Sequence, residues 1–159
     1  MLEYFWLMPE LGLANLQDFR ILRKIPMGFR HSDLDDNLIF ERLSAKHKAA
    51  LARAKNKIVR ISRKEAANVM SFFKDFVLHA QSASECQNKG ARYCLVIGRS
   101  VVRGVELPTA DFLADVICHS GYELVDSMYY EIRRHYMKFP RRSNSGKIVR
   151  DQILVFERG

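Results

Sequence analysis

The fold of this chain is decided by one stretch: Arg92-Tyr-Cys-Leu-Val-Ile97, followed by the turn Gly98-Arg99-Ser100. The apolar run is long enough for a buried strand and too short for a helix. Glycine lets the backbone bend where the strand ends, and this is the end at which ligands sit in open α/β sheets. We therefore expect a sheet that contains Arg92 to Ile97 as a strand.

The residues that follow indicate a helix and then two strands. Pro108-Thr109 predicts the helix start, with Thr109 as the N-cap and Asp111 in the first turn, where a negative charge suits the helix dipole. An apolar face precedes Gly121, which is placed to end the helix, and it consists of Phe112, Leu113, Val116 and Ile117. The alternation in Tyr122 to Ile132 and in Ile148 to Phe156 predicts two strands that pair antiparallel.

The amino-terminal half is typical of helices. Ser62-Arg-Lys-Glu65 predicts a capping box, in which the serine oxygen accepts from the N3 amide and the glutamate reaches back. A core stripe follows at helical spacing: Ala66, Val69, Met70, Phe73, Phe76, Val77 and Ala80. We expect a polar connection from Gln81 to Gly90. One or two further helices are predicted within Leu34 to Lys57, the second beginning near Ser44.

The order of these elements resembles the carboxyl-terminal half of the S-adenosylmethionine-dependent DNA methyltransferases that modify exocyclic amines of adenine or cytosine. The matching segments are Tyr93-Cys-Leu-Val-Ile-Gly-Arg-Ser100, Gly104-Val-Glu-Leu-Pro-Thr109, Gly121-Tyr-Glu-Leu-Val125 and Asp151-Gln-Ile-Leu-Val-Phe-Glu157. Leu2 to Leu7 and Leu22 to Gly28 are similar to the family's segment after its catalytic tetrapeptide. The resemblance spans nearly the whole chain. It implies an α/β class and a partial Rossmann-like methyltransferase fold, a helical amino-terminal half followed by strand, helix and antiparallel hairpin, with the last strand between two others.

Two signatures of that family are missing. The catalytic one is Asp, Ser or Asn followed by Pro-Pro and an aromatic residue, but no two of the four prolines here are adjacent. The cofactor signature is a glycine-rich turn, but the eight glycines contain no Gly-x-Gly pair. The chain begins just past the point where the tetrapeptide is expected. We therefore assign no catalytic or cofactor-binding residue, and we expect S-adenosylmethionine, which the family implies, not to bind this chain alone.

The net charge of +8 is concentrated in two places. Clustered positive charge attracts a polyanion by Coulomb attraction and by counterion release. The loop between the last two strands carries the first cluster, and we expect it either to contact DNA or to be a solvated connection. Its basic residues are Arg133, Arg134, Lys138, Arg141, Arg142, Lys147 and Arg150.

The second cluster runs from Arg20 to Lys64 and includes the helix that begins near Ser44. The resemblance implies that an insertion near this helix can help to recognise DNA. The candidate contacts are Lys46, Arg53 and Lys57. With Lys48 and Lys55 included, the basic residues do not form a single stripe opposite an apolar face. A solvated helix face is the alternative interpretation.

The remaining reactive residues predict no metal site and no catalytic cluster. Cys86, Cys94 and Cys118 lack metal-ligand spacing, and the patterns around Cys94 and Cys118 predict reduced core thiols in a cytoplasmic protein. The five histidines have no carboxylate or cysteine at ligand spacing. No run of 18 or more apolar residues exists, which excludes a transmembrane helix in this sequence.

We expect a single partial domain, in which residues 1–61 are helical and include a target-recognition region, and residues 62–159 form the carboxyl-terminal half of the sheet. Three strands leave a face or an edge exposed, which favours pairing with a second chain that carries the missing half, or self-association. Two functions remain open. One is a portion of a DNA methyltransferase, incomplete on its own; the other is a non-catalytic basic DNA-binding module or methyltransferase remnant. A methyltransferase portion that acts on RNA is a third interpretation.

Overall fold

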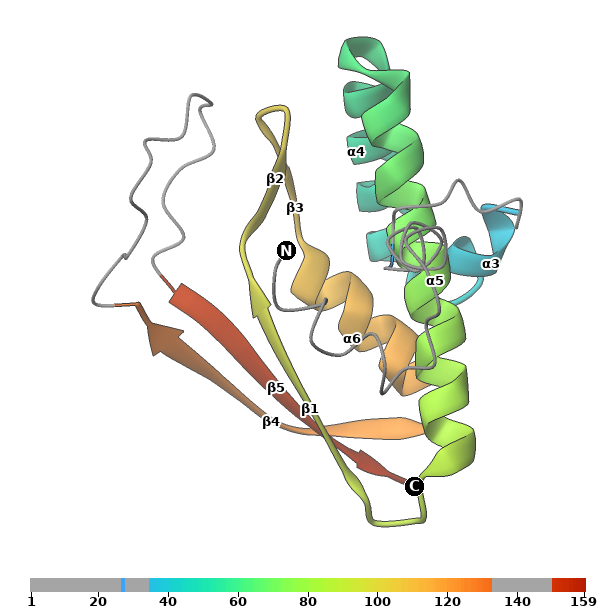
Figure 1. Ribbon diagram of the computed structural model, residues 1–159, viewed down its shortest axis with the longest axis vertical. Helices are drawn as coiled ribbons and strands as arrows, with labels where there is room; N and C mark the ends of the chain where they lie inside the picture. Colours follow the sequence, from blue (N-terminus) through green and yellow to red (C-terminus); the bar gives the residue numbers. More distant parts are fainter. Residues whose placement is uncertain (1–26, 28–34, 133–149) are drawn as a thin grey trace, which may run out of the picture.

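The computed structural model describes residue 27, residues 35–132 and residues 150–159, and these form a mixed α/β structure (Figure 1). Helices come first along the chain, and a sheet follows with one helix inserted. The elements are α3 (Asn37–Phe40), α4 (Ala45–Ile61), α5 (Arg63–Cys86), β1 (Arg92–Gly98), β2 (Ser100–Val102), β3 (Val105–Leu107), α6 (Thr109–His119), β4 (Tyr122–Glu131) and β5 (Arg150–Arg158).

The main sheet has the strand order β1-β5-β4, so the last strand lies between the other two. β5 is antiparallel to both neighbours: Leu154 pairs with Leu95 of β1 and with Ser127 of β4. β1 and β4 therefore run in the same direction, and α6 lies in the connection between them. This confirms the predicted strand at Arg92–Ile97 and the predicted antiparallel pairing of the two later segments. The strand ends differ from the predicted ones by one or two residues.

The core lies between α5, α6 and the face of the sheet that they cover (Figure 1). Phe73, Phe112 and Phe156 are each at most 1% exposed, and the Phe73 and Phe112 rings meet edge to face with centroids 5.6 Å apart. Burying a side chain of this size stabilises the fold by about 1.5 to 3 kcal/mol. The predicted stripe on α5 is confirmed, since six of its seven residues are buried and Val69 is half-buried.

The start of α5 forms half of the predicted capping box. The Ser62 hydroxyl accepts from the Glu65 amide at 3.3 Å. The Glu65 carboxylate does not reach back but accepts from Arg103 Nε at 2.6 Å, because the following hairpin brings that guanidinium to the helix start. The other end of α5 extends to Cys86, so the polar connection is shorter than expected.

A hairpin, β2–β3, follows the predicted turn Gly98-Arg99-Ser100, in a segment for which the sequence predicted no element. Its two-residue loop is Arg103-Gly104, and both residues have positive φ, of 50° and 78°, as the favoured two-residue hairpin loops require. Leu107 of the hairpin is buried against Ile58 of α4. The hairpin also shifts the start of α6: Pro108 is the N-cap, and Thr109 is the first helical residue rather than the cap. Gly121, at φ 89°, ends that helix as expected.

Cys94 and Cys118 are not the core thiols that the sequence predicted. Cys86, Cys94 and Cys118 are all exposed. In β1 the apolar run is buried on one face only, so Tyr93, Leu95 and the residues in register with them face the helices while Cys94 faces away. Cys118 lies on the outer side of α6, and partial burial still raises the pKa of its thiol.

An ionic cluster attaches α3 to the two long helices. The Asp36 carboxylate binds Lys55 Nζ of α4 at 2.5 Å and lies 3.4 Å from Lys74 Nζ of α5. Burial raises the pKa of Asp36, but the hydrogen bonds and charges of Lys55 and Lys74 outweigh it, and the pKa lies below its ordinary value. A carboxyl whose pKa is lowered by folding stabilises the fold above its unfolded pKa, and this stability is lost as the pH falls through the folded pKa.

We expect Asp36→Asn to lower the free energy of unfolding by roughly 1 to 2 kcal/mol at pH 7, because bonds between charged groups are lost at a partly screened site. The difference from the wild type should shrink as the pH falls below about 4, the unfolded pKa, and should vanish below the folded pKa, where the wild-type carboxyl is also neutral. Urea denaturation at several pH values measures both effects. An equal difference at pH 7 and pH 3 would contradict the ionic origin of this stability.

Candidate nucleic-acid interface

The helix α4 separates apolar and basic residues onto two faces. Leu51, Ala54 and Ile58 are buried and pack towards α5 and the hairpin. Four cations are exposed on another face: Lys46, Arg53, Lys57 and Arg60. Their intervals of seven, four and three residues are close to whole helical turns, so the side chains align. We call these four residues the basic stripe. At 1.5 Å per residue it is about 21 Å long.

Three candidate contacts from the sequence, Lys46, Arg53 and Lys57, align on one side of α4. The five basic residues named from the sequence do not form a single stripe, as expected. Lys48 lies on another side of the helix, and Lys55 forms the ion pair with Asp36. Arg60 was missed. Its spacing from Lys57 was the signal that could have identified it.

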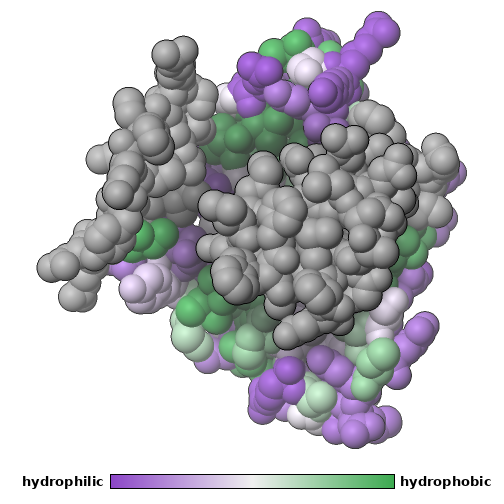
Figure 2. Space-filling view, viewed as in Figure 1, coloured by the Kyte–Doolittle hydropathy of each residue, from purple (hydrophilic) through white to green (hydrophobic). Residues whose placement is uncertain are grey.

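No described acidic residue pairs with the basic stripe. The sequence of α4 contains no Asp or Glu, and none of the stripe residues forms an ion pair within the described part of the chain. Like charges one turn apart destabilise a helix by about 0.2 to 0.5 kcal/mol per pair. Figure 2 shows hydrophilic side chains gathered at the top of the view, where α4 ends and α5 begins. The stripe is thus a local cost to stability and a fixed array of positive charge.

The position of α4 is set at its start by Asp115 of α6. Asp115 Oδ2 accepts from the Ser44 amide at 2.8 Å and lies 2.6 Å from His47 Nδ1. The His47 ring also meets Phe112 edge to face, with centroids 5.7 Å apart. Burial raises the pKa of Asp115, but the bonds from Ser44 and His47 outweigh it, and the pKa lies below its ordinary value. Sequence reasoning missed this pair, because its members are 68 positions apart.

Most residues of the other candidate surface lie outside the described residues: Arg133, Arg134, Arg141, Arg142 and Lys147. Arg150 is described and begins β5. Its guanidinium carbon lies 4.7 Å from the centre of the Tyr129 ring on β4, a cation–π contact. The structure therefore separates Arg150 from the α4 candidates and places it at the carboxyl end of β4.

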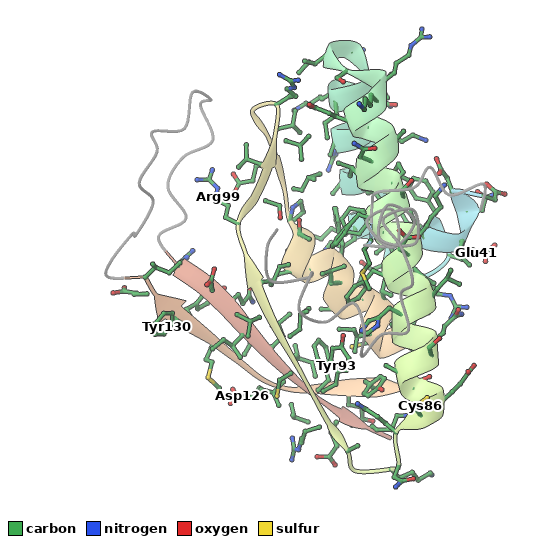
Figure 3. All side chains as sticks on the ribbon, in the orientation of Figure 1. Glu41, Cys86, Tyr93, Arg99, Asp126 and Tyr130 are labelled. Atoms are coloured by element: carbon green, nitrogen blue, oxygen red, sulfur yellow. The ribbon has the colours of Figure 1, made fainter. Side chains whose placement is uncertain are left out.

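A cleft of about 530 Å³ lies where β1 ends and α6 begins, and Arg150 and Tyr129 form part of its wall. Arg99 and Glu106 face each other across the β1–β3 side of the cleft through two hydrogen bonds of 2.8 and 2.9 Å. In Figure 3 the labelled Arg99 lies at the base of the hairpin, beside the strands. No described lining residue is a His, Cys, Ser or Lys, so the described walls offer no histidine base and no thiol or amine nucleophile.

The residues of this cleft do not fit S-adenosylmethionine. One carboxylate, Glu106, is already bound by Arg99, and the other, Asp111, lies in the first turn of α6. The positive charge of Arg150 would repel the cofactor's sulfonium. The described walls thus offer neither a Gly-x-Gly turn nor a neutral surface, and we derive no reaction step through this cofactor.

Within 35–132 and 150–159, no group of three or more His, Cys, Asp or Glu could hold a metal ion. None of the helices in that part of the chain is long and apolar enough to cross a membrane.

The comparisons with known proteins give the chain no family. Neither the protein-family models nor the curated proteins nor the solved structures contain a match to it.

Proposed function

We propose that this chain is a DNA-binding portion of a site-specific DNA methyltransferase, a group of enzymes that transfer a methyl group from S-adenosylmethionine to an exocyclic base amine. The observation that carries DNA binding is the exposed, uncompensated basic stripe on α4. In this proposal the chain is incomplete as an enzyme, and a second chain supplies the catalytic tetrapeptide and the cofactor turn.

The stripe has dimensions that suit duplex DNA. The major groove of B-DNA is about 12 Å wide and admits an α-helix. A stripe of about 21 Å spans that width, so cations at its two ends reach phosphates on both edges of the groove. Phosphate contacts provide affinity and position rather than sequence discrimination. The basic stripe therefore accounts for binding to DNA and leaves the choice of base unassigned.

The strand order supports the methyltransferase context. The resemblance implies a last strand that is antiparallel and lies between two others, and β5 has this position between β1 and β4. The helix α6 crosses over between the two parallel strands, as the resemblance also implies. This agreement extends over β1, α6, β4 and β5.

A second candidate function is a DNA-binding protein without catalysis. The composition of the cleft favours it, because the described walls carry no histidine, thiol or amine and do not suit the cofactor. The two candidates share the basic stripe. They differ in whether methyl transfer appears when the missing half is supplied.

We expect the isolated chain to bind S-adenosylmethionine with a dissociation constant weaker than about 1 mM, or not at all, because no glycine turn or available ribose-binding carboxylate is present. Isothermal titration measures this directly. Saturable binding near 1 μM, equivalent to about −8 kcal/mol, would show that other residues form a cofactor pocket.

We expect Arg53→Ala/Lys57→Ala to weaken binding of a 20-base-pair duplex at low salt. The slope of log affinity against log salt should become shallower by about 1.8, since each lost phosphate contact contributes about 0.9. Both residues are exposed, and alanine favours a helix, so the fold should persist. Fluorescence anisotropy at several salt concentrations measures the affinity and the slope.

The matched control is Lys48→Ala/Lys89→Ala, which removes the same charge from exposed positions outside the stripe. It should change the affinity and the slope less than the stripe variant does. Equal effects of the two double variants would show that DNA binding depends on the overall positive charge of the chain and not on the basic stripe. If neither variant matters and Arg141→Ala/Arg142→Ala weakens binding instead, the loop between β4 and β5 is the contact surface.

A further inference from the structure

The face of the sheet that points away from the helices is apolar at its centre. Residues paired across strands share a face. One row across β1, β5 and β4 consists of Val96, Ile153 and Met128. The next row on the same face contains Cys94 of β1 and Val155 of β5. Val96 is 60% exposed and Met128 43%. The two neighbours of Val155 along β5, Leu154 and Phe156, point to the helices and are buried. We call the outward side of the sheet the open face.

The open face is unusual for an antiparallel sheet. Such sheets commonly alternate between apolar residues that face a core and polar residues that face water. Here both faces of β1 and β5 are apolar, and no described element packs on the outer one. Figure 2 shows hydrophobic residues exposed among hydrophilic ones over the strands at the left of the view. An exposed apolar area of this kind marks an interaction surface.

The charged residues around the open face are mainly acidic, although the chain has a net charge of +8. Glu123 and Glu157 are paired at one end of the strands, and Asp151 lies in register with Tyr130 at the other. Asp126 of β4 pairs with Val155 of β5. Figure 3 shows Asp126 and Tyr130 on the side of β4 that points away from the helices, whereas Tyr93 points towards the helices. Arg92 is the one cation in these rows of described residues, and Glu157 binds it at 2.7 Å.

This charge distribution disfavours a second copy stacked on the same face. If two copies stack through their open faces about a two-fold axis, each end of the strands in one copy lies over an end of the strands in the other. Because the described residues carry carboxylates at both ends of the face, either arrangement brings carboxylates together, and like charges at close range are destabilising. The complementary partner is apolar at its centre and basic at its margins.

The dimensions of the open face match one helix. Three strands spaced about 4.8 Å apart place the outer strands about 10 Å from each other, which equals the width of one helix. We propose that the open face docks a single amphipathic helix of a partner protein, with an apolar stripe bordered by lysine or arginine at both ends. This inference does not depend on DNA binding, because the basic stripe on α4 is a separate set of residues.

The test uses two synthetic helical peptides with the same leucine stripe, one flanked by lysines and the other by glutamates. We expect the lysine peptide to bind the full chain at least tenfold more tightly than the glutamate peptide, and more weakly as salt is raised. Val96→Lys/Met128→Lys should weaken that binding at least tenfold. The matched control is Leu78→Lys, an equally apolar residue on α5 that is 44% exposed, and it should bind as the wild type does.

Circular dichroism checks that the lysine variant folds, and Val96→Thr/Met128→Gln replaces it if it does not. The stripe variant Arg53→Ala/Lys57→Ala should keep wild-type affinity for the lysine peptide, which separates this proposal from the DNA proposal. The proposal is overturned if both peptides bind alike, if neither binds, or if the open-face variants keep full affinity. It is also overturned if sedimentation shows a wild-type dimer that the open-face variants dissociate.

Discussion

The pairing of β5 with two strands at once is the constraint on which the rest of this structure depends. Because β5 is antiparallel to both β1 and β4, those two strands must run in the same direction, and parallel strands require a crossover. The crossover contains α6, whose apolar face then covers one side of the sheet together with α5. Leu154 and Phe156 of β5 supply the centre of that covered side. The same strand presents Ile153 and Val155 to the other side, where no described helix covers them.

The position of α4 follows from this arrangement through α6. Asp115 of α6 binds both Ser44 and His47, and Asp36 joins α3 to α4 and α5 through two lysines. These polar contacts hold a helix whose outer side carries uncompensated positive charge. Apolar packing of Leu51 and Ile58 supplies the stability that such a helix lacks by itself. A helix that is locally unfavourable but firmly attached is consistent with selection for binding rather than for stability.

Local signals predicted the elements well, and they failed where a partner is distant in sequence. The Ser62 cap, the stripe on α5 and the strand at Tyr93 all depend on residues within a few positions. The hairpin at Arg103-Gly104 was missed because only Gly104 has a recognisable turn signal, while Arg103 adopts positive φ with the packing of the hairpin. Cys94 was misplaced because a continuous apolar run does not show which of its two faces meets the core. The spacing of Lys46, Arg53, Lys57 and Arg60 was enough to find the basic stripe, whereas the ion pair of Lys55 joins residues 19 positions apart.

Lysine footprinting with and without a DNA duplex tests the central claim most directly, because it reports individual residues in the intact chain. Exposed lysines are acetylated and quantified by mass spectrometry. The account predicts that DNA protects Lys46 and Lys57, while Lys48 and Lys89 react as they do without DNA. Equal protection of all four residues, or protection of Lys48 and Lys89 with none at Lys46 and Lys57, would contradict it.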